Sequence, residues 1–108
     1  MGITVELRDE RGGLVRGLPD PEDGTFNAAG EYDRLIPFED QSFRLLRYVN
    51  PHGDTVFNTL QMQDLLADLD QVDEREAQAI ERRGLARLRV IAERCRDEPH
   101  LYVWFIGD

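Results

Sequence analysis

The last apolar run of the chain carries hydrophobic side chains on both faces of a predicted strand. This run, Leu101–Ile106, reads LYVWFI. Because a strand sends alternate side chains to opposite sides, leucine, valine and phenylalanine face one way, whereas Tyr102, Trp104 and Ile106 face the other. Both sets favour burial, so we expect this strand in the centre of a sheet.

Shorter runs predict four further strands. Ile3–Arg8 alternates apolar and polar side chains, which is typical of a strand with one buried face. A turn that contains two glycines then returns the chain into a short strand, Leu14–Leu18. Aromatic and β-branched residues predict strands at Phe43–Val49 and Thr55–Leu60. Proline and glycine in Asn50–Asp54 favour a tight turn, so we expect these two strands to form a hairpin.

Helical spacing of apolar residues predicts two helices before the final strand. Leucines and a valine at helical intervals indicate a short helix over Gln63–Val72. Asp73 and Glu76 have the spacing of a capping box, which marks the start of a second helix that continues to about Asp97. Pro99 ends this helix.

The order of these elements predicts a single α+β domain over residues 1–108. Hairpins favour a two-layer domain with a mostly antiparallel sheet of about five strands and two helices packed on one face. The final strand is then central, and its second apolar set remains on the face without helices. An apolar patch of this kind usually marks a binding surface. The candidate interface residues are Tyr48, Tyr102, Trp104 and Ile106.

A long acidic loop separates the second predicted strand from the third. Residues 19–41 contain seven acids and one arginine, and prolines and glycines interrupt any long regular element. The same stretch carries several apolar side chains, which favours a loop packed on the domain over a solvated linker. These side chains are Phe26, Tyr32, Leu35, Ile36 and Phe38.

Composition and charge narrow the partners and the compartment. The net charge of −9 disfavours nucleic acid and anionic membranes, because binding to either requires an excess of cationic side chains. No apolar run is long enough to span a membrane, and the N-terminus lacks the features of a signal peptide. The single cysteine, Cys95, cannot form an internal disulfide bond, so we expect a cytoplasmic protein.

Candidate chemistry is sparse. His52 and Asp54 lie in one predicted turn, where an imidazole and a carboxylate could serve as a base and its orienting group. No nucleophile lies in a recognisable motif beside them, so the interpretation as turn-forming residues is favoured. Metal binding is not favoured, because His52 and His100 are far apart in the sequence and one cysteine cannot build a thiolate site. We therefore predict no catalytic residue, no metal site and no cofactor.

Three segments in the last two thirds of the chain are similar to a group of small bacterial proteins of uncharacterised function. These segments are Tyr48–Asn58, Leu60–Met62 and Glu98–Tyr102. The resemblance implies a small intracellular bacterial protein. It implies no activity and no site residues, and it does not extend to the acidic loop.

Two functions follow from these patterns as hypotheses. The favoured one is a non-enzymatic interaction module that binds a second copy of itself or another protein through the face without helices and the acidic loop. The alternative is a small-molecule-binding protein or a small enzyme, with a pocket between loop 19–41 and the sheet. The polar groups of that pocket would be Asp33, His52 and Asp54, with Tyr48 beside them.

Overall fold

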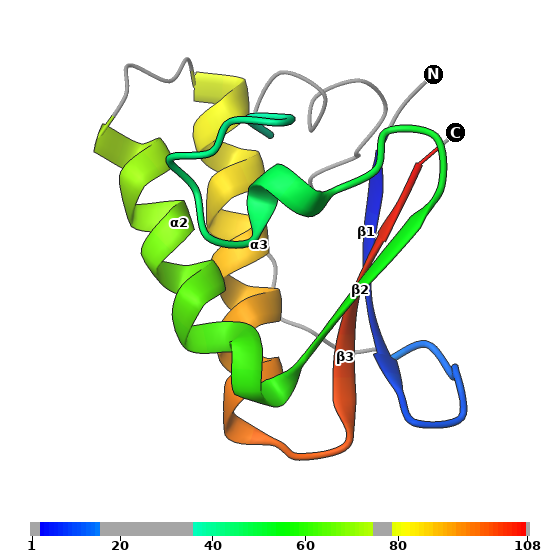
Figure 1. Ribbon diagram of the computed structural model, residues 1–108. Helices are drawn as coiled ribbons and strands as arrows, with labels where there is room; N and C mark the ends of the chain where they lie inside the picture. The colour runs from blue at the N-terminus through cyan, green and yellow to red at the C-terminus, as the bar shows by residue number, and fades with distance from the viewer. Residues whose placement is uncertain (1–2, 16–35, 75–78, 108) are drawn as a thin grey trace.

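The described residues form a sheet of three antiparallel strands, with Leu101–Ile106 in the centre. The structure, a computed structural model, describes residues 3–15, 36–74 and 79–107. β1 (Thr4–Asp9) and β2 (Asp54–Asn58) flank β3 (Leu101–Ile106), in the order β1-β3-β2 (Figure 1). The prediction that the final strand is central is therefore confirmed.

β3 takes the central position because it can bury side chains on both faces while both of its edges are paired. On one face, Val103 and Phe105 are fully buried, and the Phe105 ring meets the Phe57 ring of β2 edge to face at a centroid distance of 5.7 Å. On the other face, Tyr102, Trp104 and Ile106 are half-buried. A strand with this composition loses the most apolar exposure between two neighbours.

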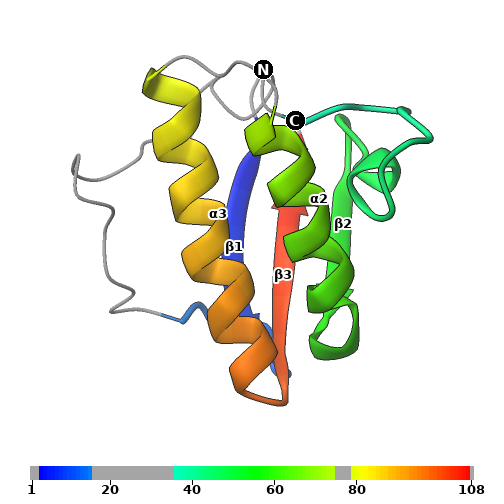
Figure 2. The ribbon, with the colours of Figure 1, turned by 90° about the vertical axis from the view of Figure 1, so that its left-hand side faces the viewer.

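Two helices form a second layer over one face of the sheet. α2 (Met62–Glu74) and α3 (Ala79–Asp97) lie side by side on the same face (Figures 1 and 2). Apolar side chains from these helices and from all three strands join in one core. The predicted α+β class and the packing of both helices on one face are confirmed. The predicted number of about five strands is wrong, since the described residues form a sheet of three.

The predicted strand at Phe43–Val49 is wrong. The segment forms irregular turns and one turn of 3-10 helix, η1 (Leu46–Tyr48). The carboxylate of Asp68, on α2, accepts hydrogen bonds from the backbone amides of residues 44–46 at 2.8, 2.7 and 3.0 Å. Amides bound in this way are not available to a neighbouring strand, so the segment lies outside the sheet.

The predicted strand Leu14–Leu18 is reduced, within the described residues, to a single bridge. Leu14 pairs with Arg8, and the Val15 amide donates to the Leu7 carbonyl at 2.8 Å. The turn before it is held by the Asp9 carboxylate, which accepts the amides of residues 11 and 13 at 2.9 and 2.8 Å. The rest of the predicted strand, residues 16–18, lies outside the described part of the chain.

The predicted turn before β2 is present, but it does not join two strands. The Gly53 amide donates to the Asn50 carbonyl at 3.4 Å, and the turn connects η1 to β2. β2 ends at Asn58, two residues before the predicted end of the strand. The side chain of Gln61 accepts the Asn58 amide at 2.9 Å, which begins the 3-10 turn η2 (Thr59–Gln61) that leads into α2.

Both predicted helices are present, with small differences at their ends. α2 extends one residue before and two residues after the predicted Gln63–Val72, and α3 ends at Asp97 as predicted. Residues 75–78 lie outside the described part of the chain, so the capping box of Asp73 and Glu76 stays a prediction. Neither described helix is long and apolar enough to cross a membrane.

The end of the predicted acidic loop packs on the helix side of the sheet. Ile36 is buried in the core, and Phe38 packs against the core. The segment that starts at residue 36 lies beside α2 and β2 on the side where the helices are (Figure 2). The remaining apolar residues of the predicted loop, Phe26, Tyr32 and Leu35, lie outside the described part of the chain.

Candidate interaction surface

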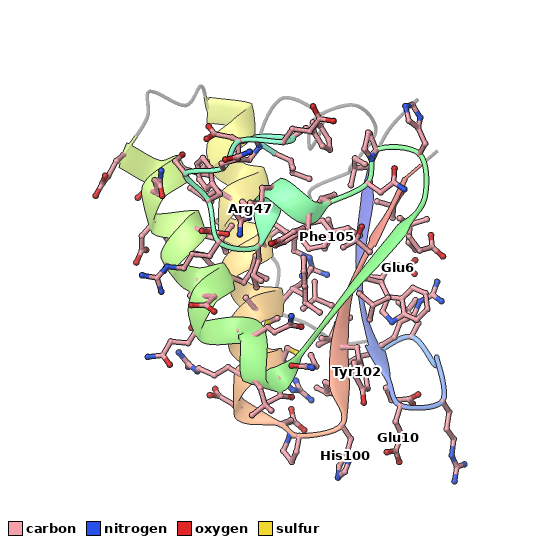
Figure 3. All side chains as sticks on the ribbon, viewed as in Figure 1. Glu6, Glu10, Arg47, His100, Tyr102 and Phe105 are labelled. Carbon is pink, nitrogen blue, oxygen red and sulfur yellow. The ribbon has the colours of Figure 1, made fainter. Side chains whose placement is uncertain are left out.

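The face of the sheet without helices is formed by alternate residues of all three strands. The pairing register aligns these residues in three rows that run across the strands. We call the surface that these rows form the open face. The rows are Thr4, Ile106 and Asp54; then Glu6, Trp104 and Val56; then Arg8, Tyr102 and Asn58. Figure 3 shows Glu6 on the open face and Phe105 on the opposite side, toward the helices.

The centre of the open face is an indole that is partly covered by an ion pair. The Arg8 guanidinium carbon lies 4.7 Å from the centre of the Trp104 ring. The Arg8 Nε donates to the Glu6 carboxylate at 2.9 Å, and Nη2 donates to the same oxygen. A cation held over an aromatic face is attracted by the ring electrons. The Arg8–Glu6 ion pair therefore covers part of the aromatic patch that the sequence of β3 predicts.

The exposed apolar area lies on both sides of this centre. Val56, beside Trp104 on β2, is 41% exposed. Leu14 extends the third row beyond Arg8 and is 45% exposed. Val56 and the half-buried side chains of β3 form an apolar band on the open face, and Arg8 separates Leu14 from this band.

Residues of opposite charge occupy two diagonally opposed corners of the open face, and the Arg8 side chain extends inward from its corner over the Trp104 ring. Arg8 is at the end of β1 that pairs with Tyr102, and Asp54 is at the end of β2 that pairs with Ile106. Within the described residues, the Arg8 guanidinium uses Nε and Nη2 for Glu6, which leaves the Nη1 side without a hydrogen bond, and the Asp54 carboxylate makes none. Both corner charges are therefore able to bind a further group.

The residues proposed for the alternative pocket do not meet in a cavity within the described chain. His52 is exposed in the turn before β2, where its amide donates to the Asn50 side chain at 2.9 Å. Asp54 is exposed on the open face, and Asp33 lies outside the described residues. Tyr48 is 60% exposed on η1, outside the three strands, and the Arg47 guanidinium stacks on its ring at 4.7 Å. Of the four candidate interface residues, the structure therefore places Tyr102, Trp104 and Ile106 on the open face, with Tyr48 apart from them.

Two shallow hollows flank an exposed leucine at the base of the molecule. Leu60, on η2, is 89% exposed. One hollow, of about 300 Å³, lies between Leu60, Pro99 and Tyr102, and a second, of about 390 Å³, lies between Leu60, Leu66 and Arg96. Beside the first hollow, His100 Nδ1 lies 3.2 Å from the Glu10 carboxylate, at the lower edge of the sheet (Figure 3). Because Tyr102 lines the first hollow, the apolar band continues around the base toward Leu60.

Reactive groups are not gathered at any of these places. In the described part of the chain, no three His, Cys, Asp or Glu side chains are grouped so that they could hold a metal ion. Cys95 is fully buried in the core, and burial raises the pKa of its thiol. A buried thiol of this kind is neutral near pH 7 and is not nucleophilic.

Sequence reasoning missed the contribution of the outer strands to the open face. Val56, Leu14 and Arg8 were not among the candidate residues, and Asp54 was named only for the alternative pocket. The alternation in β1 correctly indicates that Glu6 and Arg8 point away from the core. The row in which a residue of β1 or β2 lies depends on its pairing register with β3, which joins segments far apart in the chain and has no local signal. Leu14 is different, because it pairs with Arg8 across a local turn.

Comparisons with known proteins found no matching family model, no matching curated protein and no matching solved structure. The resemblance of the last two thirds of the chain to small bacterial proteins therefore stays a prediction.

Proposed function

We propose that this protein is a non-enzymatic interaction module that binds a protein partner through the open face. The proposal rests on one observation, which is that the two faces of the sheet differ in what covers them. Helices cover one face, whereas the described residues of the chain place no second layer over Tyr102, Trp104 and Ile106.

The composition of the open face matches that of protein interfaces. Tyrosine, tryptophan and arginine are enriched in the buried centres of such interfaces, where large side chains bury apolar area and keep one polar group. Tyr102, Trp104 and Arg8 are neighbours on this face, and Glu6, Asp54 and Asn58 supply polar groups around them. An apolar centre with a polar rim is the usual arrangement at a specific contact.

Position 56 offers a direct test. We replace Val56 by a photo-crosslinking amino acid, illuminate cells that make the protein, and identify the adduct by mass spectrometry. The captured protein is then purified and titrated against the wild-type chain. A matched control carries the same amino acid at Glu93, an exposed position on α3.

The proposal requires a defined adduct from position 56, direct binding by the purified partner, and weaker binding of Val56→Glu. The loss should exceed about tenfold, because a carboxylate at the centre of an apolar contact loses its hydration on binding. Equal adducts from positions 56 and 93, or unchanged binding by Val56→Glu, contradict the proposal.

The alternative function, a small-molecule site between loop 19–41 and the sheet, stays a prediction. Most of that loop lies outside the described residues, and His52 and Asp54 are exposed where they are described. Isothermal titration of candidate ligands against wild-type protein and the His52→Ala variant tests it. Unchanged ligand affinity in the variant removes His52 from the hypothesis.

A further inference from the structure

We propose that the protein partner is a second copy of this chain, which packs its open face against the first in a twofold-symmetric dimer. The inference rests on the proposed function and specifies the partner of the same surface. In this dimer the twofold axis lies parallel to the sheets, beside Trp104. The strands of the two sheets then cross at nearly right angles, which is one of the two common arrangements of packed sheets.

The charges at the corners of the open face select this arrangement. An axis through the corners Thr4 and Asn58 exchanges the two other corners, so that Arg8 of each copy faces Asp54 of the other. Two contacts between opposite charges result, because a twofold axis repeats every contact. The same axis places Trp104 against its own copy and Tyr102 against Val56.

Other twofold axes do not pair these charges. An axis through the corners Arg8 and Asp54 places each charge against its own copy, which is repulsive. An axis along β3 places Arg8 against Asn58, and an axis across the strands places Arg8 against Thr4. Like charges in contact disfavour an interface, and neutral neighbours leave the corner charges unpaired. Of these axes, only the one through Thr4 and Asn58 therefore pairs Arg8 with Asp54, and it also places Glu6 against Ile106.

The Arg8 guanidinium has the geometry for a second carboxylate. Its Nε and Nη2 atoms are directed to Glu6, and the Nη1 side makes no hydrogen bond within the described residues. Asp54 of the second copy can accept from that side while the bond to Glu6 is kept. A planar guanidinium can bind two carboxylates in this way, with donors on separate edges.

The size of the open face indicates a weak dimer. Three strands of five or six residues cover about 14 Å by about 20 Å, from the spacing of strands and residues in a sheet. This area is smaller than the roughly 800 Å² that each partner buries in a standard stable interface. We therefore expect a dissociation constant in the micromolar range or above.

A charge exchange tests the arrangement. Arg8→Asp leaves two acids at the facing corners, and Asp54→Arg leaves two arginines, so each variant alone should dimerise at least about tenfold more weakly than wild type. In an equimolar mixture, both contacts of the mixed dimer again join an acid to an arginine. Sedimentation equilibrium over a concentration series should therefore show that the mixture recovers an affinity close to that of the wild type.

The control is the fold of each variant, measured by circular dichroism and thermal unfolding. If Arg8→Asp does not fold, Asp54→Arg still has to weaken the dimer at least about tenfold, and Asp54→Asn has to weaken it less. Quenching of Trp104 fluorescence by acrylamide should decrease as the wild-type chain dimerises, since the indole lies at the axis.

The outcomes separate this inference from the proposed function. A wild-type chain that remains monomeric at every concentration overturns the dimer, and an adduct from position 56 to a different protein then leaves the proposed function standing. A wild-type dimer whose affinity is not restored in the mixture overturns the diagonal arrangement. Absence of both a dimer and an adduct contradicts the two proposals together.

Discussion

A single buried carboxylate determines the path of the chain between residues 43 and 49. Asp68 is 1% exposed and accepts three backbone amides from that segment. Its neighbours on α2, Asp64 and Asp70, are acidic as well but are solvated and pair with arginines. Helical spacing places Asp68 beside the apolar stripe of α2, three residues after Leu65 and four before Val72, but the sequence does not show which groups lie opposite it on another element.

We expect Asp68→Asn to destabilise the protein by about 2–4 kcal/mol, because the amide nitrogen replaces an accepting oxygen that faces backbone N–H groups. Urea unfolding measures the loss. The control, Asp64→Asn, removes only an exposed ion pair with Arg44 and should cost less than about 1 kcal/mol. Similar urea midpoints for the two variants would show that the buried carboxylate of Asp68 stabilises the fold no more than the exposed ion pair does.

The buried thiol of Cys95 makes stability depend on pH in the alkaline range. Burial raises its pKa above the ordinary value of 9.0, and the sulfur donates to the Leu101 carbonyl at 3.3 Å. The folded chain keeps a proton that the unfolded chain releases, so this contribution is complete below about pH 9 and is lost as the pH rises through the folded pKa.

The Cys95→Ala variant isolates that effect, because it removes the thiol and leaves every other side chain unchanged. Between about pH 8 and about pH 10, the free energy of unfolding should fall more steeply for wild type than for Cys95→Ala, which lacks the group. Urea midpoints at a series of pH values measure the two slopes. Equal slopes of the free energy of unfolding against pH would mean that the thiol does not contribute to the pH dependence of stability.

At the scale of elements, the sequence predicted the strands and helices that carry a regular apolar pattern of their own. β1, α2 and β3 were located to within two residues, and the end of α3 was predicted correctly. These segments carry regular apolar patterns, and burial of one or both faces follows from the pattern. The segment at Phe43–Val49 has a β-rich composition, but its backbone amides are bound by a side chain from another element.

The turn before β2 is held against the last residues of β3 by a close backbone contact. The Gly107 amide donates to the Gly53 carbonyl at 2.8 Å. A Cβ atom at Gly107 would lie 2.6 Å from the carbonyl oxygens of Asn50 and Pro51, a separation that requires the backbone to move. Glycine is thus needed here for space.

We expect Gly107→Ala to destabilise the protein by about 1–3 kcal/mol, as overpacking does. Thermal unfolding measures the change. Gly12→Ala is a useful comparison, since that position has open space within 4 Å but a φ of 81°, and it should cost about 1–2 kcal/mol from backbone strain alone. A Gly107→Ala variant as stable as wild type would show that the turn relaxes freely away from β3.

At the scale of the whole molecule, the net negative charge of each chain opposes dimerisation through the open face. Each chain carries a net charge of −9, whereas the open face itself holds Glu6, Arg8 and Asp54 and is nearly balanced. The excess of acid therefore lies elsewhere and acts over longer distances. Salt screens such repulsion more than it screens a contact that is partly buried.

The dimer should consequently bind several-fold more tightly at about 0.15 M salt than at about 0.01 M, where the Debye length is about 30 Å. Sedimentation equilibrium at a series of salt concentrations measures the dependence. A basic protein partner would show the opposite trend, with an affinity that falls as salt rises. If the affinity of the dimer fell steeply as the salt concentration rose, the balance of charges described for the open face would be contradicted.

The amino-acid pattern alone determined the two-layer α+β architecture, the central place of the last strand and the presence of an apolar set on the face without helices. These properties follow from local periodicity and from the tendency of apolar side chains to leave water. Only the tertiary structure decided the number of strands, the role of Asp68 and the position of Arg8 and Asp54 at opposite corners. Each of these depends on pairing between segments far apart in the chain, and pairing register and long-range hydrogen bonds leave no trace in the local sequence.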